Sequence, residues 1–438
     1  MPDTKKYRTV FIILCFLIIT SAASIIKSPV PAYGLTGADV ALYTDLHTND
    51  SGVWNDGLTA IKTMLRRMNL TYEEIDYMDL NTSTQDFSSL YKVIFFPGGM
   101  AYHYNNLVCS QGKERIRDFI QNGGGYFGIC AGAFFAVDQA IWDDATGGGN
   151  PVLYDDDTGY LNACDGPSGY SLDLFPGIGV GPINDIASFY GYYEGWAMTS
   201  VTFQTNTVLP YFKGSTGLKT MPFSEDIMYY GGPYFIYDQT NPLTTNVSNY
   251  QVLATYDNNS QAAIISFQYG SGKVVLSGPH PEIEEDSNRD NQNLLDYPYS
   301  PRKWELDDNG SDWELVSHLL DWIMNTDRPI TYVMTPPQRR MIFSPGENIA
   351  PIVQTITNHS QTDSTVSLNT YLIIPGGQHI NLNRFSIHLA SGETRTLLRT
   401  FPVSVNFSAG RYVFGVTVRD GLNTIIDQDH LVFRVASP

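Results

Sequence analysis

Tyr126-Phe127-Gly128-Ile129-Cys130-Ala131-Gly132-Ala133 is the stretch that decides the fold of the longer part of this chain. Its apolar first half predicts a buried strand that runs directly into a cysteine and small residues. The pattern Gly128-Ile129-Cys130-Ala131-Gly132 is the cysteine form of the G-x-S-x-G nucleophile elbow, a sharp turn between strand and helix that exposes a nucleophile. Gly128 and Gly132 allow the turn and a close approach of the helix. The alternative is a structural cysteine at a tight turn.

Segments before this turn alternate between strand-like and helix-like patterns. Apolar runs at 40–44 and 93–96 predict buried strands, 72–77 alternates as a strand, and the apolar spacing of 58–68 predicts a helix. Alternation of strands and helices favours a parallel sheet covered on both faces. Because parallel strands end at one common edge, we expect Cys130 at the carboxyl edge of that sheet.

The segment after the elbow is less regular. Residues 138–222 are rich in Gly, Asp and Tyr, and we expect an insertion with short strands near the mouth of the site. Strands expected at 252–256, 262–267 and 274–276 form an antiparallel meander, and a helix is expected at 311–324. Four residues are candidates for substrate contact from the insertion, with surface or core roles as the favoured alternative: Glu194, Glu225, Tyr229 and Tyr230.

A composition shift at Asp327-Arg328-Pro329 predicts a domain boundary, with a linker to Pro336-Pro337. Beyond it, β-rich segments alternate with turn clusters at spacings typical of an immunoglobulin-like sandwich. Strands are expected at 352–356, 365–374, 394–401, 411–418 and 431–435. We therefore predict an α/β domain at 36–328 and an all-β sandwich at 329–438.

The N-terminal segment has the pattern of an export signal. Lys5, Lys6 and Arg8 precede an apolar run, and Ser21-Ala22-Ala23 suits cleavage by a signal peptidase. Retention as a membrane anchor is the alternative, because the apolar stretch approaches the roughly 17-residue minimum for a spanning helix. Residues 1–35 are thus a signal peptide or an N-terminal membrane anchor plus linker, and the rest is extracytoplasmic, secreted or anchored.

The part of the chain expected to be exported contains an odd number of cysteines. Cys15 lies in the export segment, so Cys109, Cys130 and Cys164 remain. One arrangement is a disulfide between Cys109 and Cys164 with Cys130 free, because disulfides persist in oxidising compartments.

Two further motifs supply partners for Cys130. Pro97-Gly98-Gly99 ends a predicted strand, and the amides of Gly98 and Gly99 can form an oxyanion hole with that of Ala131. The alternative for this motif is an ordinary turn between strand and helix. His280-Pro281-Glu282 follows another predicted strand and offers a base with an orienting carboxylate.

These three motifs, in this order, resemble the class I glutamine amidotransferase-like superfamily. The resemblance is closer to the biotin-protein ligase N-terminal domain family, whose members show similar Pro-Gly-Gly, Gly-x-Cys-Ala-Gly-Ala and Gly-Pro-His-Pro-Glu stretches. It covers about residues 36–325 and includes Gly278-Pro279-His280-Pro281-Glu282. It implies a flavodoxin-like sheet with Cys130 as nucleophile, His280 as base and Glu282 as orienting residue. No biotin-ligase catalytic domain follows, so biotinylation is not implied.

The function expected from these motifs is that of an exported cysteine-dependent hydrolase with a Cys-His-Glu triad. Its substrate would be a small-molecule or peptide amide or a related acyl compound, without a cofactor or metal. Ammonia transfer is less expected because it requires a synthetase partner and usually ATP. A net charge of −19 excludes nucleic acid as a partner, and membrane contact is expected only through the N-terminal segment. The alternative is a non-catalytic cell-surface binding or scaffold protein. The sequence does not define the oligomeric state.

Overall fold

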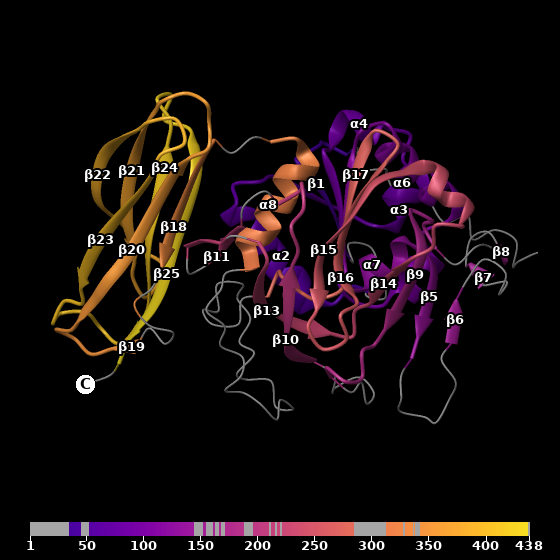
Figure 1. Cartoon of the computed structure of the whole chain (residues 1–438), viewed down its shortest axis with the longest axis horizontal. Helices are drawn as coiled ribbons and strands as arrows, with labels where there is room; N and C mark the ends of the chain where they lie inside the picture. The colour runs from indigo at the N-terminus through magenta and orange to yellow at the C-terminus, as the bar shows by residue number, and fades with distance from the viewer. Residues whose placement is uncertain are drawn as a thin grey trace, which may run out of the picture. The chain divides into compact units, whose positions relative to one another are not determined.

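The computed structural model divides the chain into two units, Met1–Leu35 and Thr36–Pro438. Figure 1 labels the helices and strands of the second unit. It describes residues 35–44, 52–143, 152–154, 161–162, 166–167, 171–187, 196–209, 212–214, 217–219, 221–283, 312–326, 329–335, 337 and 342–436. The predicted export segment before residue 35 lies outside these ranges, as does Cys164. Within the described ranges, no helix is both long and apolar enough to span a membrane.

A parallel core of five strands carries the α/β part. Its order is β2 (Tyr72–Ile75), β1 (Val40–Tyr43), β3 (Val93–Phe96), β4 (Gly125–Ile129) and β17 (Gly272–Ser277). All residues of β1, β3 and β4 are buried, as expected of strands covered on both faces. The predicted parallel sheet of an α/β domain is therefore confirmed.

Helices follow the strands of this core. The bounds are α2 (Asn55–Arg67), α3 (Tyr77–Thr82), α4 (Phe87–Leu90), α5 (Ala101–Leu107), α6 (Ser110–Gln121), α7 (Ala131–Ala136) and α8 (Asp312–Met324). Helix α2 buries the predicted apolar face, which includes Leu58, Ile61 and Leu65. Helices α6, α7 and α8 pack on β4 and β17. The helix predicted at 311–324 thus exists and contacts the centre of the sheet.

The segment between β4 and β17 extends the same sheet. Beyond β17 the order continues through β16 (Ala262–Tyr269), β14 (Tyr234–Tyr237), β9 (Phe175–Gly181), β5 (Val137–Trp142) and β6 (Val152–Tyr154). These additions include antiparallel pairs, so the sheet is mixed. The insertion therefore contributes longer and more integrated strands than its composition predicts.

A branch of the sheet carries further inserted strands. β15 (Val247–Tyr256) pairs with β16, β10 (Trp196–Phe203) pairs with β15, and β13 (Phe223–Tyr230) pairs with β10, all antiparallel. The predicted meander β15-β16-β17 is confirmed. Short elements complete this part: β7 (Leu161–Asn162), β8 (Gly166–Pro167), β11 (Phe212–Gly214), β12 (Gly217–Lys219) and the 3-10 helix η4 (Pro242–Asn246).

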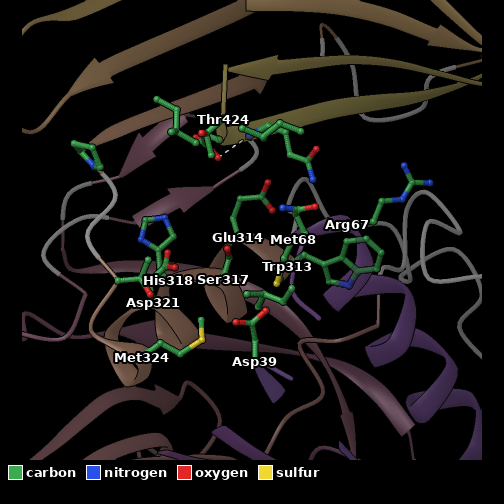
Figure 2. Close-up of a pocket in the computed structure, with 18 of the residues that line it drawn as sticks. Asp39, Arg67, Met68, Trp313, Glu314, Ser317, His318, Asp321, Met324 and Thr424 are labelled. Atoms are coloured by element: carbon green, nitrogen blue, oxygen red, sulfur yellow. Dashed lines mark hydrogen bonds between the residues drawn. The ribbon is translucent and has the colours of Figure 1, made fainter. Parts of the chain in front are cut away.

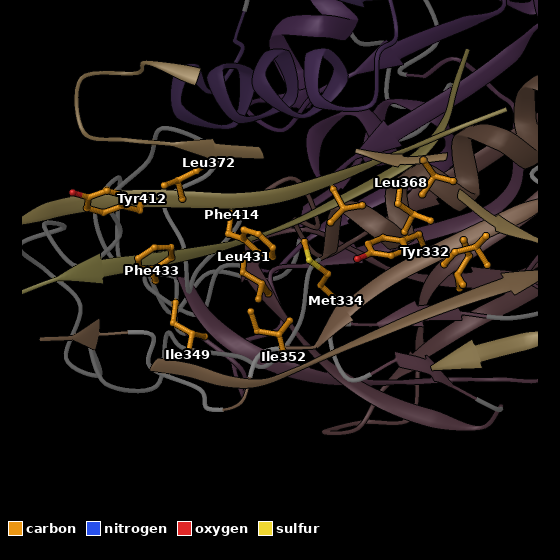
Figure 3. Packing of buried hydrophobic residues seen from close by; sticks show 14 of the residues in the cluster. Tyr332, Met334, Ile349, Ile352, Leu368, Leu372, Tyr412, Phe414, Leu431 and Phe433 are labelled. Carbon is orange, nitrogen blue, oxygen red and sulfur yellow. The ribbon is translucent and has the colours of Figure 1, made fainter. Parts of the chain in front are cut away.

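The C-terminal part contains two sheets around one apolar core (Figure 3). One sheet has the order β18 (Ile330–Thr335), β20 (Asn348–Asn358), β23 (Thr394–Pro402). The other has the order β19 (Ile342–Phe343), β25 (Ile425–Val435), β24 (Gly410–Arg419), β21 (Ser364–Ile373), β22 (His379–Leu389). Side chains from both sheets, such as Tyr332 and Phe433, fill the space between them.

The linker predicted up to Pro336-Pro337 is wrong, because residues 330–335 form β18. Asp427 and Asp429 accept hydrogen bonds from the backbone N–H groups of Tyr332 and Met334 at 2.5 and 2.6 Å. These carboxylates tie β18 to β25 and integrate it into the sandwich. Strand β22 was not predicted either.

Candidate active site

Cys130 lies at a strained turn between β4 and α7. Its backbone has φ 49° and ψ −104°. Residues other than glycine rarely adopt a positive φ of this kind. The backbone N–H donates to the carbonyl oxygen of Ser277 at 2.8 Å, which fixes the turn against β17. The side chain is a free thiol, 7% exposed. A strained turn between strand and helix is what the predicted nucleophile elbow requires, and the role of Cys130 as a nucleophile stays a prediction.

Close packing explains both elbow glycines. A Cβ at Gly128 would lie 2.5 Å from the carbonyl oxygen of Gly132. A Cβ at Gly132 would lie 2.2 Å from the carbonyl oxygen of Phe96. Both neighbours are backbone atoms that cannot rotate away, so the elbow forms only with glycine at these two positions.

His280 and Glu282 form a buried pair immediately after β17. His280 Nδ1 and Glu282 Oε1 are 2.8 Å apart, and neither residue is exposed. The backbone N–H of His280 donates to Met228 O at 2.7 Å. Trp313, labelled in Figure 2, donates its indole N–H to Glu282 O at 2.8 Å. Because Nδ1 is engaged with the carboxylate, Nε2 is the nitrogen left for a proton transfer.

The charge of His280 depends on both neighbours. Burial alone would lower its pKa, but the charge of Glu282, the charge of Cys130 and hydrogen bonds to both raise the pKa to about 10. Among the described residues Nε2 has no hydrogen-bond partner of normal geometry, and the thiol donates to Tyr230 O at 3.4 Å. The contact between sulfur and imidazole is therefore a loose one. It brings the imidazole of His280 next to the thiol of Cys130, with which a proton can be exchanged.

The predicted oxyanion residues lie around this pair. Gly132 N–H donates to Pro97 O at 3.1 Å, which joins the elbow to the Pro97-Gly98-Gly99 turn. Ala131 begins α7, where N–H groups have no acceptor within the helix. Within the described ranges, the N–H groups of Gly98, Gly99 and Ala131 have no backbone acceptor. Gly98 packs against the His280 ring, and the role of these three N–H groups in binding an oxyanion stays a prediction.

Trp54 is a neighbour of the site that sequence reasoning missed. It precedes α2, and its ring meets that of His280 edge to face, with 5.1 Å between centroids. Its backbone N–H donates to Gly98 O at 3.0 Å. The position of the first strand-helix connection at the carboxyl edge of a parallel sheet was the available signal.

The four candidates from the insertion have different positions. Tyr230 contacts the sulfur through its carbonyl oxygen. Tyr229 is buried, and its hydroxyl bonds with Ile183 N and Gly232 O, which indicates a structural role. Glu225 is buried in β13, and Glu194 lies outside the described residues.

Two other sequence expectations bear on the site region. Cys109 is disulfide-bonded, and the predicted partner Cys164 lies outside the described residues. The cavity in Figure 2 is lined by Asp39, Trp313, Ser317, His318 and other residues. None of Cys130, His280 and Glu282 lines it, so the site does not coincide with this cavity.

Comparisons with known proteins agree with the motifs. The family profile "Biotin-protein ligase, N terminal" matches residues 43–311. A biotin-protein ligase of Schizosaccharomyces pombe is 29% identical over 200 residues, which are 45% of this chain and 26% of that protein. An uncharacterized protein of Chlamydia muridarum is 29% identical over 193 residues, 44% of this chain and 60% of that protein. The chain therefore spans less than two thirds of the length of either relative.

Solved structures add little. A β-glucuronidase of Bacteroides uniformis has a TM-score of 0.21 at 17% identity, covering 24% of this chain and 14% of its own. A CARDB domain of Pyrococcus furiosus has a TM-score of 0.19 at 14% identity, covering 25% of this chain and 88% of its own. Likeness at this level supports no conclusion about fold or activity. The family profile, in contrast, covers more than half of the sequence and contains all three motifs, and the chain belongs to the biotin-protein ligase N-terminal family.

Proposed function

We propose that the α/β domain is a cysteine-dependent hydrolase that cleaves an amide or a related acyl bond. Cys130 is the nucleophile, His280 carries the proton, and Glu282 orients the imidazole. The observation that carries the proposal is the buried His280–Glu282 pair beside Cys130. Burial lowers the pKa of His280, but the charges of Glu282 and Cys130 raise it to about 10. Perturbed titratable groups of this kind concentrate at functional sites.

The chemistry balances with these groups alone. The thiol proton of Cys130 passes to His280 as the sulfur attacks the carbonyl carbon. A C–S bond forms, and the carbonyl electron pair moves to oxygen. The N–H groups of Gly98, Gly99 and Ala131 are the donors available to that oxygen. The C–N bond then breaks, the amine takes the proton from His280, and a thioester remains. Water attacks the thioester, His280 accepts its proton, and cleavage of the C–S bond releases a carboxylic acid.

The finer fold assignment belongs to the same proposal. The parallel order β2-β1-β3-β4-β17 is the 2-1-3-4-5 order of flavodoxin-like sheets. It supports a class I glutamine amidotransferase-like domain, in which the site lies at the carboxyl edge of the strands. For the C-terminal part, two packed sheets with antiparallel pairs support an immunoglobulin-like sandwich.

We place this hydrolase outside the cytoplasm. The disulfide of Cys109 supports an oxidising compartment, and the sequence of residues 1–35 has the pattern of an export signal. Fusing residues 1–40 to a reporter that is active only after export tests this placement. A reporter that stays inactive, while a fusion to a known signal peptide is active, contradicts it.

The reaction is tested by acylation of the thiol. We expect p-nitrophenyl acetate to release p-nitrophenolate with an acyl group bound to Cys130, identified by mass spectrometry of the intact chain. Cys130→Ala should abolish this product, and His280→Gln should slow its formation. If Cys130 is alkylated by iodoacetamide but is never acylated, the non-catalytic binding or scaffold role replaces the hydrolase.

A further inference from the structure

We propose that the site selects acyl substrates that carry a large apolar group, which binds against Trp54, Trp196 and Tyr230. This inference rests on the proposed hydrolase and names the class of its substrate. It follows from partly exposed aromatic side chains that surround the Cys130–His280 pair.

Two of these rings lie against the His280 ring. The Tyr230 ring lies 6.3 Å from it, centroid to centroid, and the backbone carbonyl oxygen of Tyr230 accepts the hydrogen bond of the Cys130 thiol at 3.4 Å. The Trp54 ring lies 5.1 Å from the His280 ring and 5.3 Å from the Tyr230 ring, edge to face in both cases. Both side chains are partly exposed. A substrate whose carbonyl carbon reaches the sulfur therefore has aromatic surface beside it.

The inserted strands enlarge this surface. In the β10–β13 pair, Trp196 is opposite Tyr230 and Met198 is opposite Met228. Trp196 and Met198 are also partly exposed, and they pack with Trp54 and Tyr230 on the buried residues Ala60, Met228 and Ile283. Ile283 directly follows Glu282. The apolar cluster thus extends from the nucleophile to the orienting carboxylate.

Apolar surface beside a reactive group is typical of ligand recognition. The group that the site prefers beside the acyl carbonyl is therefore apolar.

The experiment compares two neutral alkylating probes of Cys130 that differ in the size of their apolar group. N-benzyl iodoacetamide and iodoacetamide are each reacted with the full chain, and labelling of Cys130 is followed by mass spectrometry. In each case a C–S bond forms, iodide leaves, and the thiol proton is lost to His280 or water. Rates are divided by those measured with glutathione, which removes intrinsic differences in probe reactivity.

We expect the normalised rate for N-benzyl iodoacetamide to exceed that for iodoacetamide about tenfold or more, because apolar sites discriminate between ligands by the size of their apolar groups. The rate for N-benzyl iodoacetamide should also saturate as its concentration rises. Trp196→Ala and, independently, Met198→Ala should lower the benzyl-to-iodoacetamide ratio. Leu422→Ala, at a position 88% exposed in the sandwich, should keep it. Thermal unfolding of each variant verifies that it is folded.

Equal normalised rates for the two neutral probes would overturn the inference, as would a ratio that both variants leave unchanged. These outcomes differ from failure of the hydrolase proposal. That failure appears as absence of acylation by p-nitrophenyl acetate, whereas alkylation reports the aromatic preference whether or not turnover occurs.

Discussion

Replacing Gly98 with alanine tests the position of His280 directly. A Cβ at Gly98 would lie 2.5 Å from Cε1 of His280, whereas ordinary carbon contacts begin at about 3.5 Å. Gly98 does not have a positive φ, so alanine at this position introduces no backbone strain. The imidazole must therefore move by about 1 Å, a displacement that lowers a catalytic rate about 100-fold. The accompanying overpacking costs about 1–3 kcal/mol of stability.

The assay is the rate of Cys130 acylation by p-nitrophenyl acetate in a double-mutant cycle. Wild type, Gly98→Ala, His280→Ala and the double variant are compared, with Gly421→Ala as the control because a Cβ there meets no atom within 4 Å. We expect the Gly98→Ala effect to vanish in the His280→Ala background. An equal effect in both backgrounds, or a wild-type rate in Gly98→Ala, would refute the assigned role of His280.

Three further predictions concern the same residues. Glu282→Gln removes a charge that raises the pKa of His280, so the pKa of this imidazole should fall from about 10 towards 6.5. NMR titration of the ring measures this pKa, and an unchanged value contradicts the electrostatic pairing with Glu282. Because the pKa of His280 in the folded state exceeds 6.5, this residue contributes stability that is fully present below pH 6.5 and lost as pH rises through about 10. The difference in free energy of unfolding between wild type and His280→Gln, measured with urea, should therefore shrink over this pH range. A constant difference would exclude the link between stability and the protonation of His280. Gly132→Ala should destabilise the protein by about 1–3 kcal/mol, against about 0.5 kcal/mol or less for Gly421→Ala, as measured by urea unfolding; similar values for both would show that α7 tolerates the added Cβ.

The parallel core and the three motifs were predictable because their signals are local. Continuous apolar runs marked β3 and β4, and glycine pairs marked the turns that follow them. The elbow needs glycine for contacts within a few residues, as between Gly128 and Gly132. Local steric requirements of this kind appear directly in the sequence.

The missed features depend on contacts between distant segments. β18 has only six residues and is followed by prolines, and its N–H groups bond to carboxylates 95 residues away in sequence. β9 has the loop-like sequence Phe-Pro-Gly-Ile-Gly-Val-Gly. Yet a Cβ at Gly177 would lie 2.1 Å from Ile236 O, so glycine here serves the close approach of β14. The intrinsic strand propensities of the β18 and β9 sequences are low. Such propensities do not include contacts with strands that are distant in sequence.

The topology separates the reacting residues from the surface proposed to select the substrate. Cys130 and His280 follow adjacent parallel strands, β4 and β17, and the hydrogen bond from Cys130 N–H to Ser277 O fixes one against the other. The number of residues inserted between β4 and β17 does not affect this contact between the two strands. Trp196 and Tyr230, in contrast, belong to β10 and β13 of the insertion. Strand β13 also contacts the N–H group of His280 and the thiol of Cys130, but it does so through the backbone carbonyl oxygens of Met228 and Tyr230. Exchanging side chains of β10 is therefore the direct way to change substrate preference while the Cys130–His280–Glu282 arrangement stays in place.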